Sequence, residues 1–346
     1  MTSKYLKHPT IPLRVKKGKP TSQLLDEMLA TGFQGKTLAE AFAIWKMMLR
    51  EKNITIWLGL SGAIVPAGMR RLIAYLIEER FVDAVVSTGA QLFHDAAEAL
   101  GVVHFRGSAM LDDKALLKEG IDRFYDVLVQ EKLQRRVDRQ VQLFIEGLEP
   151  GRQYSSREFF FLLGKHLSKK AVNKDSILIK AAAAGVPVFA PALADSSIGY
   201  SFVMARQNKI VRYVDQIKDI EETALIAARS KKSGVIYLGG GVPKNFIQQT
   251  ELLNQILGSK LRGHEYAVQL TTDTPHFGGL SGCTFTEAQS WGKIAGNAKM
   301  AQCFCDVTIG LPFLAQALCE EGSLARKRNK PVFDWNGDKL KIGYKR

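Results

Sequence analysis

The sequence is poor in cysteine and has no long hydrophobic run. Its four cysteines all lie after residue 280 of 346, which is not the distribution of a disulfide framework in a secreted domain. No stretch reaches the roughly 18 uncharged apolar residues of a transmembrane helix, and the N-terminus carries lysines without the apolar segment of a signal peptide. These absences predict a cytoplasmic protein in a reducing compartment, with no membrane partner.

The sequence also has no pattern that is typical of a metal site. Its six histidines show no metal-ligand spacing. Cys303 and Cys305 stand two residues apart in an expected strand, so their thiols should point to one face. No second pair lies nearby in sequence, so we interpret both as core residues rather than metal ligands. We predict that the protein has no metal site.

Acidic residues are too few to balance the lysines and arginines, and the net charge is +14. The two ends of the chain carry 12 of these charges, within residues 1–19 and 326–346. We therefore expect a basic N-terminal extension over residues 1–34, one large domain over 35–322 and a basic C-terminal tail over 323–346. Solvated ends are the first interpretation, and contact with nucleic acid or with a partner subunit is the alternative.

Short apolar runs rich in β-branched residues alternate with segments of helical length. This alternation predicts an α/β fold: a doubly wound, mostly parallel, Rossmann-like sheet with helices on both faces of a single large domain. The expected strands are 54–60, 82–88, 186–193, 234–240, 265–272 and 301–309. The expected helices are 66–80, 113–147, 156–168, 174–185, 216–231 and 242–258.

Small and polar residues follow five of the six expected strands. The segments are SGAIVPAG (61–68), TGAQLFHD (88–95), ADSSIG (194–199), GGGVPKN (239–245) and TTDTPHFGGLSG (271–282). Ligands of such sheets bind outside the carboxyl ends of the strands, and glycine there exposes backbone amides to phosphate. No GxGxxG follows the first strand, so a nucleotide-sized ligand would be held differently from the common dinucleotide arrangement.

Several motifs in these segments resemble those of the deoxyhypusine synthase family, in the same order and over roughly residues 35–320. They are LADSSIG, YLGGGVPKN, GGLSG and, most specifically, EAQSWGKI at residues 287–294. The resemblance implies NAD as cofactor, a homotetramer with active sites at a subunit interface, and a catalytic lysine within SWGKI. In this sequence that lysine is Lys293.

The family reaction gives these residue types a chemical reason. In that reaction, NAD takes a hydride from spermidine, 1,3-diaminopropane leaves and the aminobutyl group passes to the enzyme lysine as an imine. An acceptor amine then displaces that lysine, and the retained NADH reduces the new imine. Lys293 must be neutral to attack, and apolar surroundings favour the neutral amine. Trp291 can supply such surface and hold an amine cation against its ring, while Glu287 can receive an ammonium group or move a proton.

By the same resemblance, the family's cofactor-binding residues correspond to residues at the expected strand ends of this sequence. Thr88 and Gly89 match a strand end beside the cofactor, Asp195 matches an aspartate near the nucleotide, and Asp306 matches one at the adenosine end. Gly62 and Ala63 depart from the eukaryotic pattern, which has a Ser-Asn pair there. The cofactor-binding residues predicted in this way are Ser61, Gly62, Thr88, Gly89, Asp195, Gly240, Gly241, Thr272 and Asp306.

The residues expected to bind the polyamine differ more from those of the eukaryotic members of the family. Tyr200 and Leu280 replace acidic residues, Asn245 replaces a histidine and His94 replaces a glutamate. Each charge-assisted hydrogen bond lost is worth about 1.5–3 kcal/mol, so a retuned pocket is expected; the alternative for Tyr200 and Leu280 is a change of packing alone. The predicted substrate-binding residues are Trp291, Glu287, His94, Asn245 and Tyr200.

Three functions follow from this pattern. The first is an enzyme, a transferase of the aminobutyl group from a polyamine to a lysine of the translation factor that carries hypusine. The second is homospermidine synthesis, with putrescine as the acceptor. The loss of acidic residues slightly favours this second function. The third is a non-catalytic NAD- or RNA-binding protein, against which the retained SWGKI motif argues.

Overall fold

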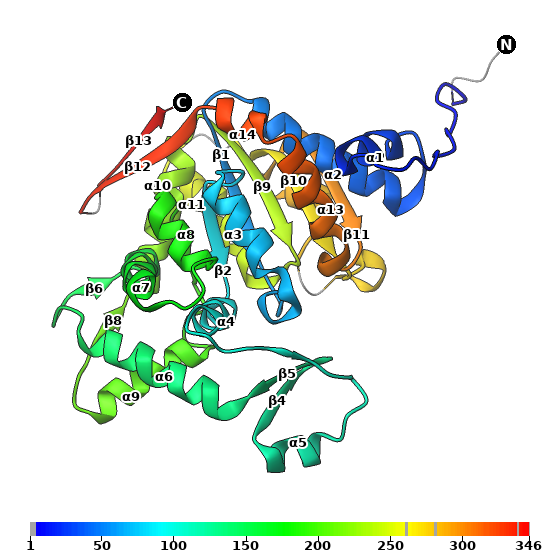
Figure 1. Cartoon of the computed structure of the whole chain (residues 1–346). Helices are drawn as coiled ribbons and strands as arrows, with labels where there is room; N and C mark the ends of the chain where they lie inside the picture. The colour runs from blue at the N-terminus through cyan, green and yellow to red at the C-terminus, as the bar shows by residue number, and fades with distance from the viewer. Residues whose placement is uncertain (1–4, 260–261, 280–281, 338, 346) are drawn as a thin grey trace.

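A parallel sheet of six strands forms the centre of the computed structural model, which describes residues 5–259, 262–279, 282–337 and 339–345 (Figure 1). The strand order is β11-β10-β9-β1-β2-β7, and every neighbouring pair is parallel. The strands are β1 (Ile54–Leu60), β2 (Ala84–Ser87), β7 (Val188–Phe189), β9 (Lys232–Leu238), β10 (His264–Thr271) and β11 (Ile294–Phe304). The predicted fold class is confirmed, and each strand overlaps its predicted range.

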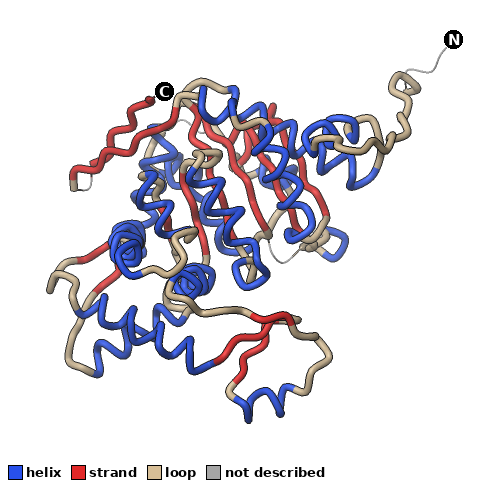
Figure 2. The backbone as a smooth tube through the Cα atoms, viewed as in Figure 1, coloured by secondary structure: helices blue, strands red, loops and turns tan. Residues whose placement is uncertain are grey.

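Helices cover both faces of this sheet (Figures 1 and 2), and the buried side chains form one apolar cluster on each face. The larger cluster joins the sheet to α2 (Phe33–Arg50), α3 (Arg70–Glu78) and α13 (Val307–Glu320). The smaller cluster joins it to α10 (Gln216–Arg229), α11 (Gly241–Ile256) and α12 (Phe285–Ser290). Strands buried on both faces explain the continuous apolar runs in the sequence.

Other elements connect the strands or extend from the sheet. They are α1 (Thr21–Met28), η1 (Val65–Met69), α4 (Gly89–Ala99), β6 (Gln153–Tyr154), α7 (Ser156–Lys170), α8 (Ile177–Ala184), α9 (Ser197–Gln207), β8 (Tyr213–Val214), η2 (Pro275–Phe277) and α14 (Ser323–Lys327). No helix within the described residues has the length and apolar character to cross a membrane.

The single helix predicted over residues 113–147 is wrong. Helix α5 (Asp113–Glu119) ends at Gly120, which adopts a left-handed conformation with φ of 67°. Strands β4 (Ile121–Phe124) and β5 (Val127–Gln130) follow as an antiparallel pair with β3 (Phe105–Arg106), and only then does α6 (Glu131–Glu146) begin. A glycine that stops one helix and a turn between two short strands interrupt a segment whose average composition is helical.

The basic C-terminal segment forms an ordered hairpin of β12 (Lys330–Asn336) and β13 (Lys339–Lys345). Its side chains alternate: Leu340 is fully buried against the smaller apolar cluster, whereas Lys339 and Lys341 point to solvent. Near the N-terminus, two backbone N–H groups in the first turn of α1 donate hydrogen bonds to the side chain of Glu320. The proposed boundary at residue 34 falls within α2, and the division of the chain into three parts stays a prediction.

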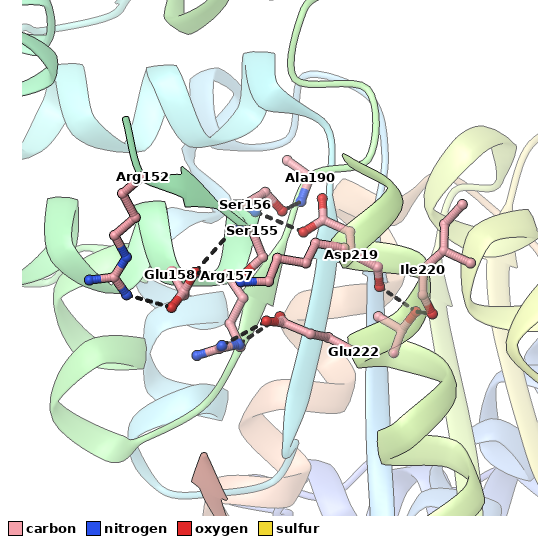
Figure 3. A network of polar contacts seen from close by, with 11 residues as sticks. Arg152, Ser155, Ser156, Arg157, Glu158, Ala190, Asp219, Ile220 and Glu222 are labelled. Atoms are coloured by element: carbon pink, nitrogen blue, oxygen red, sulfur yellow. Dashed lines mark hydrogen bonds and ion pairs between the residues drawn. The ribbon is translucent and has the colours of Figure 1, made fainter. Parts of the chain in front are cut away.

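A polar network joins α7 to α10 (Figure 3), and Trp335 of the hairpin packs against one of its members. Arg157 forms two hydrogen bonds with Glu222, at 2.7 and 2.8 Å, and its guanidinium lies 4.1 Å from the centre of the Trp335 ring. Beside this pair, the fully buried Asp219 accepts a hydrogen bond from the Ser156 backbone N–H at 2.7 Å. Burial raises the pKa of Asp219 to about 7, and the nearby Glu222 acts in the same direction.

This aspartate should make stability depend on pH. The folded-state pKa of Asp219 lies above the ordinary value of 3.8, so the folded protein binds the Asp219 proton more tightly than the unfolded chain does. The stabilisation that this proton provides is lost as pH rises from about 4 to about 7. We expect the free energy of unfolding of wild type to fall by up to about 4 kcal/mol relative to Asp219→Asn over that range. Urea unfolding of both proteins at intervals of pH measures the difference; parallel curves would contradict it.

Candidate functional site

The carboxyl edge of the sheet gathers the residues predicted to hold a cofactor. Ser61, Thr88 and Gly240 follow β1, β2 and β9, and Thr272 and Asp306 follow β10 and β11. Because the strands are parallel and adjacent, these residues share one edge. Thr88 and Asp306 are the N-cap residues that precede α4 and α13, and the side chain of each accepts a backbone hydrogen bond.

Lys293 lies in the connection between α12 and β11, and its side chain is buried, with 7% exposed. Gly292 makes this connection possible, because its φ of 70° favours glycine. The backbone N–H of Lys293 donates to the Ala288 carbonyl at 3.0 Å, which fixes the residue against the end of α12. The lysine therefore leaves a tight turn and points into the protein.

The Lys293 amine meets two of the predicted substrate residues. Its Nζ donates a hydrogen bond to Asn245 Oδ1 at 3.3 Å and lies 5.3 Å from the centre of the Trp291 ring. Asn245 belongs to α11, which starts at the carboxyl end of β9, whereas Trp291 belongs to the same connection as the lysine. Trp291 is 57% exposed, so its ring covers the amine from the solvent side.

Glu287 stands beside this group and lines a polar cavity of about 260 Å³. The cavity is also lined by Asp273 and by the glutamine side chains Gln269 and Gln302. Thr284 caps α12 by accepting the Glu287 backbone N–H at 3.1 Å, which fixes the first turn from which Glu287 projects. Two carboxylates on one small cavity provide an environment for ammonium groups.

Lys244 is a second buried amine at this site, and the sequence reasoning missed it. It is 1% exposed, and its Nζ donates to Gln269 Oε1 at 2.8 Å and to the Cys283 carbonyl. Burial lowers the pKa of Lys244 to about 8; the charge of Lys293 acts in the same direction, and Glu287 and Asp273 oppose it. The one available signal was its place in GGGVPKN, directly before Asn245.

The remaining predicted substrate residues lie elsewhere in this chain. His94, on α4, is packed 4.8 Å from the Phe124 ring and 5.4 Å from the His104 ring. Burial and His104 lower its pKa to about 4, so its imidazole is neutral at physiological pH. Tyr200 is 57% exposed on α9. Among the described residues, no hydrogen bond joins either side chain to Lys293. Leu280 lies outside the described residues.

The glycines at the strand ends differ in how much space surrounds them. At Gly62 and Gly241 nothing lies within 4 Å of the position that a β-carbon would occupy, so there is room for a phosphate beside the backbone at these positions. Gly241 also opens the 16-residue helix α11, whose N-terminus favours an anion. Gly89 instead packs tightly, because an added β-carbon would meet Ser196 Oγ at 2.6 Å. Asp195 and Asp306 are exposed carboxylates at the same edge.

Known proteins resemble this chain over most of its length. The family model described as deoxyhypusine synthase matches residues 23–318. "Probable deoxyhypusine synthase 2" of Methanosarcina mazei is 52% identical over 97% of both chains. "Deoxyhypusine synthase-like protein" of Chlorobaculum parvum is 37% identical over 91% of this chain and 87% of its own. These matches confirm the resemblance.

Solved structures agree in fold. A crystal structure of an Entamoeba histolytica protein, described as a candidate deoxyhypusine synthase, superposes with a TM-score of 0.60. The match covers 87% of this chain and 93% of that one, at 18% sequence identity. At this identity the likeness concerns the arrangement of strands and helices alone.

Proposed function

This chain belongs to the deoxyhypusine synthase family, whose members are aminobutyl transferases, and we propose that it transfers the aminobutyl group of spermidine to an amine through an imine on Lys293. The observation that carries the proposal is the burial of the Lys293 amine between Asn245 and Trp291. A lysine that served only solubility would extend into water. A buried amine with a single amide acceptor is suited to act as a nucleophile.

Each residue around the lysine has a role in this proposal. NAD, when bound, would take a hydride from the carbon beside the secondary amine of spermidine and would return it at the end to the imine of the acceptor, so that the cofactor undergoes no net change. The Lys293 amine attacks that carbon, and 1,3-diaminopropane leaves as the lysine imine forms. Asn245 orients the amine through its side-chain oxygen, while Trp291 restricts water and offers a ring face to the cationic chain. An acceptor amine then displaces Lys293.

The polar cavity is the proposed position for the free ammonium end of the substrate. Glu287 lines it together with Asp273, and two carboxylates can neutralise one or two ammonium groups. Glu287 is exposed, so it can also exchange a proton with solvent between steps. Among the described residues, neither His94 nor Tyr200 forms a hydrogen bond with Lys293, so their proposed roles in binding substrate would require a second copy of the chain.

NAD is the proposed cofactor. Gly240 and Gly241 at the start of α11, with Ser61 and Gly62, would hold its phosphates through backbone amides. Thr88, Gly89, Asp195, Thr272 and Asp306 would line the rest of the edge. Asp306 at the start of α13 offers a carboxylate to hydroxyl or amino groups of the nucleoside.

A direct test follows the leaving group. The purified protein is incubated with spermidine, with and without NAD, and 1,3-diaminopropane is quantified. The proposal expects release that requires NAD and reaches many equivalents when an acceptor amine is added. Failure to release diaminopropane with any acceptor would favour the alternative of a non-catalytic NAD- or RNA-binding protein.

Two acceptors remain to be distinguished, a lysine of the hypusine-carrying translation factor and free putrescine. The replacement of acidic pocket residues by Tyr200 and Leu280 favours the smaller amine, and homospermidine would then be the product. Offering both acceptors together and measuring each product decides between them, because the preferred acceptor will accumulate its product first.

The homotetramer with active sites at a subunit interface is also proposed for this chain. An apolar groove of about 470 Å³ runs along α10 and α11, and Asn245, the partner of Lys293, lines it. Val242 and Ile256 on this surface are 48% and 80% exposed. An exposed apolar groove that reaches Asn245, beside the proposed catalytic lysine, is suited to a contact between subunits.

A charge placed on this surface should weaken both assembly and activity. We expect Ile256→Asp to raise the subunit dissociation constant by about tenfold to a hundredfold, because a buried unpaired carboxylate opposes association. Light scattering across a dilution series measures assembly, and the diaminopropane assay measures activity. Leu117→Asp, at a side chain 77% exposed on α5, is the matched control; equal behaviour of the two variants would contradict the proposed interface.

A further inference from the structure

Two thiols lie side by side at the carboxyl end of β11, and the proposed transfer uses neither. The Cys303 thiol donates to Cys305 Sγ across 3.5 Å. Cys303 is 1% exposed, whereas Cys305 is half-buried and follows the last residue of the strand. Both side chains point to the same side, as expected for residues two apart on a strand.

We propose that Cys303 and Cys305 form a reversible dithiol–disulfide pair that responds to peroxide. Disulfide formation brings the two sulfurs from 3.5 Å to about 2 Å. The pairing of β11 with β10 ends at Phe304, so Cys305 can move without breaking a ladder hydrogen bond. The pair is therefore placed where one sulfur is held by the sheet and the other can move.

Cys305 is the thiol that meets the oxidant. Its sulfur accepts the Cys303 hydrogen bond and lies close to the first turn of α13, since an added β-carbon on Gly310 would sit 3.0 Å from it. Helix N-termini favour a thiolate. The Cys303 hydrogen bond lowers the pKa of Cys305, against the effects of burial and of Asp306. That contact and burial raise the pKa of Cys303, which keeps its proton.

The chemistry balances in two steps. The Cys305 thiolate attacks one oxygen of hydrogen peroxide, and with one proton it yields a sulfenic acid and water. The Cys303 sulfur then attacks the Cys305 sulfur, the S–O bond breaks, and the Cys303 proton leaves with the hydroxyl group as a second water. Two thiols have been oxidised to one disulfide, and one peroxide has been reduced to two waters.

The position of the pair gives the disulfide a consequence. Asp306 follows Cys305 directly and caps α13 through the Thr308 N–H at 2.7 Å. Moving Cys305 towards Cys303 shifts this carboxylate from the cofactor edge of the sheet. We expect the oxidised protein to bind NAD about tenfold more weakly, because one hydrogen bond between the cofactor and the charged Asp306 would be lost. This second part rests on the proposed function, whereas disulfide formation does not.

The test uses the full-length Cys319→Ser protein, because Cys319 shares a tryptic peptide with the pair. The protein is exposed to hydrogen peroxide, denatured, treated with N-ethylmaleimide and digested. We expect the peptide 300–326 to lose two hydrogens and to carry no maleimide, and to carry two after reduction, while Cys283 is labelled throughout. Cys303→Ser should instead accumulate a Cys305 sulfenic acid that dimedone traps.

Two outcomes would overturn the proposal. The first is full labelling of Cys303 and Cys305 after peroxide has already oxidised Cys283, which would contradict the dithiol–disulfide pair itself. The second is equal NAD affinity of the reduced and disulfide forms, which would contradict its consequence for the cofactor. Phenylarsine oxide, which bridges neighbouring thiols, provides a readout without any variant, and one arsenical bound per chain across Cys303 and Cys305 is expected. A reduced protein that binds no NAD would count against the proposed function, but it would not contradict the proposed dithiol–disulfide pair.

Discussion

Replacing Lys293 with arginine should abolish aminobutyl transfer while leaving the protein folded. Arginine keeps a long cationic side chain that can reach the Asn245 oxygen, but its guanidinium stays protonated and cannot attack carbon. Loss of a covalent nucleophile lowers turnover by about 10⁴-fold or more. We expect a decrease of that size in diaminopropane release, measured at saturating spermidine and NAD.

The controls separate chemistry from structure. Lys299→Arg, at an exposed position on the same strand β11, should retain full activity. Circular dichroism and the binding of NAD should be the same for Lys293→Arg and wild type, because the strand ends that would hold the cofactor are unchanged. Turnover by Lys293→Arg within tenfold of wild type would exclude covalent catalysis by this residue.

Lys244 should give the protein a second measurable property, a stability that rises in alkaline solution. Its pKa is about 8 when folded, against 10.5 for an ordinary lysine, so between these values the unfolded chain binds more protons. Stability therefore increases as pH rises through this range. We expect the free energy of unfolding of wild type to increase by about 3 kcal/mol relative to Lys244→Met between pH 8 and 10.5.

Denaturant unfolding at several pH values measures this difference, and comparison with the variant removes the contributions of other titrating groups. Lys118→Met, at an exposed position on α5, should follow the wild-type curve. A wild-type curve parallel to that of Lys244→Met would mean that Lys244 is not held in a desolvated site. Confirmation would place an amine that can take up a proton near pH 8 beside the proposed substrate cavity.

The sequence predicted the sheet well because its strands are buried on both faces. A continuous apolar run such as 54–60 has few other conformations in a chain of this composition, and the segment folds as β1. The antiparallel strands near Gly120 could not be predicted in this way. Most of their side chains are half-buried, and the helical composition of the flanking residues concealed two short strands.

The site was predictable only where one motif contained it. Trp291, Lys293 and Glu287 lie within eight residues of sequence, so their proximity follows from the chain itself. Lys244 escaped prediction because a lysine is exposed by default, and its burial arises from β10 and α12, which lie more than twenty residues away. The environment of His94 likewise depends on Phe124, in a segment that was expected to be helical.

The central claim is that the Lys293 amine becomes bonded to the carbon chain of the polyamine, and trapping of that bond tests it most directly. The protein is incubated with NAD and spermidine without acceptor, treated with borohydride, digested and analysed by mass spectrometry. The account predicts an aminobutyl adduct on Lys293 that requires both NAD and spermidine. An unmodified Lys293 under saturating spermidine, in protein shown to bind NAD, would contradict it.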